Sequence, residues 1–69
     1  MMAESLGEAL PKELARARRI QGYAREIGPA GMFMVAMIEQ DIQRAERAMM
    51  EGDLAGMIAA YQVLKEIKE

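Results

Sequence analysis

The sequence predicts a small all-α protein, a single domain of 69 residues that is built from three helices. Apolar residues recur at three- and four-residue spacing in three stretches, which is the period of a helix with one buried face. Gly28-Pro29 and Gly52-Asp53 separate the stretches, and such pairs mark turns. No stretch has the period of two that is typical of a strand. We expect helices at about 11–27, 31–51 and 54–68, preceded by a short N-terminal turn, as a three-helix bundle or a series of helical hairpins.

The first helix is predicted to begin near Pro11, because proline is tolerated at the first helical position. Gly28-Pro29 then ends the helix. Upstream, Ser5 and Glu8 have the spacing of a capping box, so a short turn or helix is expected before Pro11. The apolar stripe of this helix consists of Leu10, Leu14, Ala17, Ile20, Ala24 and Ile27.

The middle helix carries the most informative feature of the chain. It opens with nine consecutive apolar or glycine residues, 30–38. A helix turns once in about 3.6 residues, so this run is apolar on every side, which is more than one core-facing stripe requires. The second half is amphipathic and is expected to end at Gly52, in the left-handed conformation typical of helix ends. We expect residues 30–38 to be covered by two neighbouring helices or by a partner.

The third helix is predicted to begin after Asp53, whose carboxylate can accept hydrogen bonds from the free N–H groups of the first turn. A second side of this helix consists of alanine and glycine at positions 55, 56, 59 and 60, which would allow another helix to approach closely. The expected apolar face consists of Leu54, Met57, Ile58, Tyr61, Leu64 and Ile67.

The segment around Gly52-Asp53 also resembles a known motif. Residues 48–54, followed by Ile58, Tyr61 and Leu64, are similar to the turn and second helix of a tetratricopeptide-type hairpin. That repeat prefers alanine where Met57 and Leu64 stand, and repeats of this kind stack in several copies, of which this chain has one. The resemblance therefore implies a helix–turn–helix connection and no family.

The composition excludes several kinds of site. The chain has neither cysteine nor histidine, which removes disulfides, thiolate nucleophiles, Cys/His catalytic pairs and zinc–thiolate centres. Glu39, Gln43 and Glu46 share one helical face, but helical di-iron sites pair carboxylates with histidine. We expect no metal, no cofactor and no enzyme activity, because carboxylates, lysine and tyrosine would have to carry catalysis without a pocket to hold them.

The start of the chain is acidic where a secretory signal is basic, and the apolar run is less than half of the roughly 20 residues of a membrane-spanning helix. We therefore expect a cytoplasmic protein without a membrane partner.

The apolar run indicates a protein-interaction function. A chain this short buries only about 60% of the surface that its unfolded form exposes, so self-association is expected to complete the bundle. Eight of the residues are methionine, whose flexible side chain suits adaptable contact surfaces. A symmetric homodimer is the commonest way to bury an apolar surface left outside the core, and another helical protein is the other partner considered. The expected interface consists of Met32, Phe33, Met34, Val35, Met37 and Ile38.

Charge suggests the alternative function. Residues 11–27 carry five Lys or Arg against two Glu, and residues 39–51 carry four acidic residues against two Arg. Opposite fields favour contact between these segments, within one chain or between chains. Arginine also binds phosphate with paired hydrogen bonds. The alternative is therefore a small nucleic-acid-associated or regulatory protein whose phosphate contacts are Arg16, Arg18, Arg19 and Arg25.

Nucleic acid is the less favoured partner for two reasons. The four arginines point in several directions around the first helix. Single-stranded nucleic acid also binds through aromatic stacking, and two of the three aromatic residues, Phe33 and Tyr61, are expected to be buried.

Overall fold

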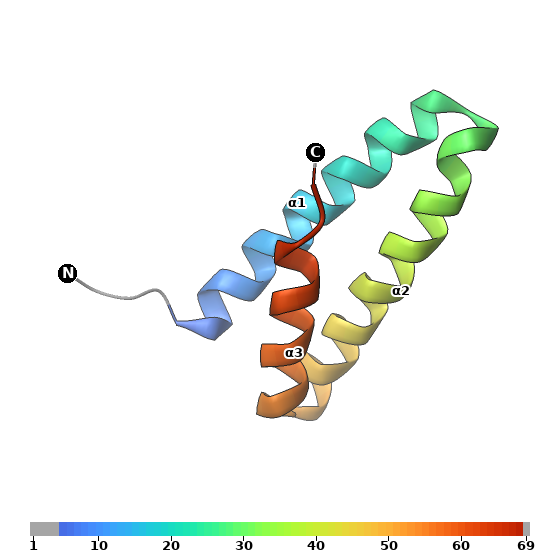
Figure 1. The fold of residues 1–69 in the computed structure, drawn as a ribbon. Helices are drawn as coiled ribbons and strands as arrows, with labels where there is room; N and C mark the ends of the chain where they lie inside the picture. Colours follow the sequence, from blue (N-terminus) through green and yellow to red (C-terminus); the bar gives the residue numbers. More distant parts are fainter. Residues whose placement is uncertain (1–4, 69) are drawn as a thin grey trace.

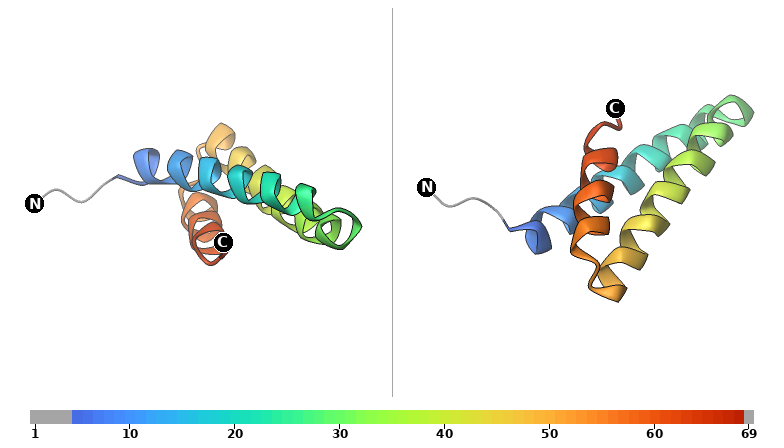
Figure 2. Two further views of the ribbon diagram at one scale, coloured as in Figure 1. Left: turned by 90° about the horizontal axis from the view of Figure 1, so that it is seen from above. Right: turned by 60° about the horizontal axis from the view of Figure 1, so that its bottom comes forward.

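The computed structural model describes residues 5–68, which form three helices, α1 (Leu6–Ile27), α2 (Pro29–Glu51) and α3 (Leu54–Lys65). Helices α1 and α2 form a long antiparallel hairpin whose arms are close together at the connecting turn and diverge toward the other end (Figure 1). The shorter α3 lies on one face of the hairpin, between the diverging arms (Figure 2). The predicted all-α architecture of three packed helices is confirmed.

The two halves of the hairpin are named here by this divergence. The narrow end comprises residues 20–38, on either side of the α1–α2 turn. The wide end comprises α1 up to residue 19, α2 from residue 39 onward, and α3. None of the described helices has the length and apolarity needed to cross a membrane.

Helix α1 begins at Leu6, five residues before the expected start at Pro11. Residues 6–10, expected to form a separate turn or helix, are the first part of α1. A proline inside a helix lacks the N–H that would bond to the carbonyl four residues earlier, here Gly7. Ser5 is the N-cap residue, but its hydroxyl donates to the Glu8 carboxylate at 2.9 Å and makes no hydrogen bond to the backbone. The predicted capping box is therefore not formed, and Ser5 and Glu8 bond to each other through their side chains.

Both turns are short. The α1–α2 turn consists of Gly28 alone, with φ of 95°, a conformation that side-chain-bearing residues rarely adopt. Pro29 then begins α2, two residues before the expected start at 31, because the first helical position needs no N–H. The α2–α3 turn matches the prediction, since Gly52 is left-handed and the Asp53 carboxylate accepts from the Gly56 N–H at 3.0 Å.

The apolar core lies mostly at the wide end. The largest fully buried side chains are Leu10, Ile42 and Leu64, one from each helix. The whole cluster consists of Leu10, Leu14, Ala17, Ile20, Ile38, Ile42, Ala45, Ala60 and Leu64. The predicted stripe of the first helix is confirmed as far as Ala24, but Ile27 is 67% exposed and lies outside the core.

Helix α3 packs against the core through most of its predicted apolar face. Ala60 and Leu64 are buried, whereas Leu54 and Ile58, which were expected to face the core, are exposed. Met57, Tyr61 and Ile67 are partly buried against the core, and a Cβ atom added at Gly56 would lie 3.2 Å from the Ala48 Cβ of α2. The predicted face is therefore confirmed at Met57, Tyr61, Leu64 and Ile67 and wrong at Leu54 and Ile58.

Candidate protein interaction surface

At the narrow end, the backbones of α1 and α2 are in direct contact. A Cβ atom added at Gly31 would lie 1.9 Å from the Ala24 carbonyl oxygen and 3.2 Å from the Ile27 Cβ. Only glycine permits this approach, because real Cβ atoms do not come so close to another atom. The space between the two helices is therefore too small for the large apolar side chains that surround this position in the sequence.

Further along the narrow end, the interior contains a polar side chain. Gln21 is buried, and its side-chain nitrogen donates to the Val35 carbonyl oxygen and to the Glu39 carboxylate, each at 3.0 Å. Glu39 also accepts from Gln43 at 3.1 Å. These two hydrogen bonds, the one from Gln21 first, lower the pKa of Glu39 below its ordinary value.

Several large apolar side chains at the narrow end are exposed, although Ile20, Val35 and Ile38 are buried there. The narrow-end surface is defined here by six of them, each between 42% and 75% exposed: Tyr23, Ile27, Met32, Phe33, Met34 and Met37. Single exposed apolar residues are common on soluble proteins, but a concentration of large ones on a small domain is typical of an interaction site.

The predicted interface residues divide into two groups in the structure. Met32, Phe33, Met34 and Met37 belong to the narrow-end surface, whereas Val35 and Ile38 are buried inside the chain. The expectation that Phe33 is buried is wrong, since it is 75% exposed.

Sequence reasoning did not assign Tyr23 or Ile27 to the interface. Helical spacing placed Ile27 on the core stripe, but the stripe of α1 extends beyond the core. The small residues Ala24 and Gly31 on facing helices were the available signal, because they allow a close approach that leaves no room for a large side chain at this point.

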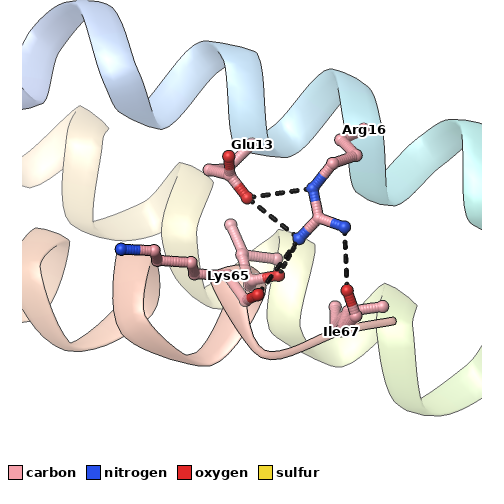
Figure 3. Close-up of polar contacts among 5 residues, drawn as sticks. Glu13, Arg16, Lys65 and Ile67 are labelled. Atoms are coloured by element: carbon pink, nitrogen blue, oxygen red, sulfur yellow. Dashed lines mark hydrogen bonds and ion pairs between the residues drawn. The ribbon is translucent and has the colours of Figure 1, made fainter. Parts of the chain in front are cut away.

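A second polar site joins α1 to the end of α3 (Figure 3). The Arg16 guanidinium donates to the carbonyl oxygens of Leu64 at 2.7 Å and of Ile67 at 2.8 Å. Glu13 accepts two further hydrogen bonds from the same group, at 3.0 and 3.1 Å. The last carbonyls of a helix have no partner within the helix, and a cation there is favourable. Helix α3 ends at Lys65, three residues before the expected position 68. Arg16 donates hydrogen bonds to the carbonyls at this end of the helix.

The other arginines proposed as phosphate contacts lie apart from one another. Arg18 forms an ion pair with Glu46 of α2, so the basic and acidic helices do meet within one chain. Arg25 is close enough to Glu39 to contribute to its lowered pKa, and Arg19 is exposed on α1. With Arg16 bound to α3, the four do not form one basic surface.

Within residues 5–68, no three acidic side chains are placed to hold a metal ion, and Glu39 and Glu46 are engaged by Gln21 and Arg18. Comparisons with models of protein families, with curated proteins and with solved structures find no match to this chain. The assignment of a function therefore depends on the narrow-end surface itself.

Proposed function

We propose that this chain is a non-enzymatic protein-interaction protein that associates with itself, as a homodimer, through the narrow-end surface. The observation that carries the proposal is the exposure of six large apolar side chains within the 19 residues of the narrow end, whereas the longer wide end exposes five. Four of the six come from the apolar first half of α2. Removing apolar surface from water contributes about 25 cal/mol per Å², so association of such surfaces is favourable.

The location of the core supports self-association in particular. Helix α3 completes a three-helix core at the wide end, but it does not extend over the narrow end (Figure 1). A second copy brings an identical surface, and a two-fold interface needs only one kind of patch on each chain. The homodimer would therefore supply the narrow end with the cover that α3 gives to the wide end.

Light scattering coupled to size-exclusion chromatography tests the proposal, over a concentration series that begins in the low-micromolar range. The parent chain should have twice the chain mass, and Met37→Glu should have the mass of a monomer with its helical circular dichroism retained. Met50→Glu is the matched control, because Met50 is on the same helix and is 87% exposed at the wide end. It should keep the parent mass.

A parent chain that remains a monomer throughout the series would overturn the proposal and leave a different helical protein as the partner to seek. Val35→Glu is unsuitable as a test, since Val35 is buried and the variant would disturb folding as well as association. The alternative role with nucleic acid has less support, because Arg16 and Arg18 use their guanidinium groups in contacts within the chain.

A further inference from the structure

The side of the hairpin on which α3 lies continues past the end of α3. At 1.5 Å per residue, the 12 residues of α3 span about 18 Å, whereas the 23 residues of α2 span about 34 Å. The contacts of Arg16 with Leu64 and Ile67 fix the position at which α3 ends. About 16 Å of hairpin therefore extends beyond α3, which is close to the length of a second α3.

The side chains along this extension continue the rows that contact α3. On α1, the row that contains Arg16 continues toward the turn at helical spacing. On α2, the row that contains Asp41 and Arg44, which line a small cavity with the α3 residues Ala60 and Val63, also continues toward the turn. We call these continuations the open bed, and its residues are Tyr23, Ile27, Met34 and Met37.

The outward side of α3 offers a surface that matches the open bed. Leu54 and Ile58, one helical turn apart, are 63% and 46% exposed. The same side becomes polar toward the other end of the helix, at Gln62 and Lys65. The outward side of α3 is therefore apolar at the end farther from Arg16.

We propose that in the homodimer the α3 of each protomer packs against the open bed of the other. This inference depends on the proposed function, since it specifies how the two copies associate. The two-fold axis is perpendicular to the long axis of the hairpin, parallel to the face that carries α3, and near the C-terminal ends of the two α3 helices. It brings Leu54 and Ile58 of one protomer onto Ile27 and Met34 of its partner. The polar Gln62 and Lys65 then lie near the axis. A parallel arrangement would instead set these polar residues against the apolar open bed.

The exposed area is sufficient for a dimer of this kind. A fully exposed large side chain offers roughly 200 Å². The four residues of the open bed, with Leu54 and Ile58, therefore expose on the order of 600 Å² per protomer. Stable interfaces bury about 600 to 1,000 Å² per partner, so the area falls at the lower limit of this class.

Disulfide cross-linking between chains tests the arrangement, because the parent chain has no cysteine. Chains with Ile58→Cys are mixed with chains with Met34→Cys and oxidised. A disulfide needs the two Cα atoms within about 7 Å, so the mixture should give a covalent dimer on a non-reducing gel. Either variant alone should remain uncross-linked, because the two-fold axis puts its two cysteines at opposite ends of the dimer. Ile58→Cys mixed with Met50→Cys is the control for random collision, since Met50 is the more exposed methionine.

The outcomes separate this inference from the function on which it depends. A light-scattering mass of a dimer, without preferential cross-linking of position 58 to position 34, would overturn the arrangement and leave self-association intact. A monomeric mass would overturn both. A covalent dimer formed equally well by the Ile58→Cys and Met50→Cys mixture would also overturn the arrangement.

Discussion

The wide and narrow ends of the hairpin share α1 and α2, yet the three largest fully buried side chains all lie at the wide end. At the wide end the helices diverge, and Leu10, Ile42 and Leu64 fill the space between them. Near the turn of the narrow end, Gly31 lies against the Ala24 carbonyl, and the space between the helices at this point admits no side chain. Whether a large apolar side chain is buried here therefore depends on the separation of the helices more than on its own hydrophobicity.

This difference gives the two ends different roles. The wide end contains most of the apolar core, to which all three helices contribute. The narrow end is held by backbone approach at Gly31 and by the hydrogen bonds of Gln21. The six side chains of the narrow-end surface are exposed and can contact a partner without any loss of core packing, which is the property that an interaction surface needs.

The largest expected difference between the two ends is in the free energy of unfolding that is lost when an isoleucine is truncated to alanine. Ile42→Ala, at a site that is 1% exposed, should lower the free energy of unfolding by about 2–5 kcal/mol through lost burial and a residual cavity. Ile27→Ala, at a site that is 67% exposed, should change it by no more than about 0.5 kcal/mol. Urea unfolding of both variants in the Met37→Glu background, which removes self-association, measures the monomer alone. Equal losses would contradict the division into two ends.

The close approach at Gly31 gives the next largest effect. Gly31→Ala would force the helices apart or bend them, and overpacking of this kind costs about 1–3 kcal/mol. Gly22→Ala on α1 is the matched control, because a Cβ atom there meets nothing within 4 Å. It should raise the free energy of unfolding by about 0.5–1 kcal/mol through its helix propensity. Thermal unfolding compares the two, and a Gly31→Ala variant as stable as Gly22→Ala would show that the narrow end is not closely packed.

The sequence allowed the local features of the fold to be predicted, because they depend on neighbouring residues. The helical periodicity, the left-handed Gly52 and the Asp53 cap all follow from chemistry within a few positions. The exposure of Ile27 and Phe33 could not be predicted in this way, because periodicity indicates an apolar side without indicating what packs against it. For the same reason, the exposure of Leu54 and Ile58 on α3 was not predicted.

The role of Arg16 also lay beyond prediction from the sequence. Its partner Leu64 is 48 residues away, and any of several basic residues on the first helix could have met the end of α3. Of the six predicted interface residues, the structure leaves four exposed. The remaining two, Val35 and Ile38, belong to the one side of the apolar run that faces α1.

Loss of the Arg16 contacts with the C-terminal end of α3 should lower the free energy of unfolding less than the change at Gly31 does. Arg16→Met keeps most of the apolar stem but removes the donors to Leu64 and Ile67, and it should cost about 1–2 kcal/mol, since hydrogen bonds from charged groups are among the stronger ones. Hydrogen exchange should become faster in the last turn of α3. Arg18→Met breaks an ion pair that is about half exposed, and such pairs contribute about 0–1 kcal/mol. Equal effects of the two variants on α3 would show that Arg16 does not hold the end of the helix.

The smallest effect concerns the polar interior of the narrow end and is seen in a titration. The hydrogen bond from Gln21 is the main cause of the lowered pKa of Glu39, and the bond from Gln43 is the next. A lowered pKa means that folding favours the charged carboxylate. Its contribution to stability is therefore complete above the pKa of the unfolded chain and is lost as the pH falls through the lower pKa of the folded chain. Gln21→Met should raise the pKa of Glu39 toward its ordinary value, and Gln43→Met should raise it less, as NMR of the side-chain carboxyl carbon would measure. A larger rise with Gln43→Met would mean that the buried amide of Gln21 positions the helices at the narrow end without stabilising the charge of Glu39.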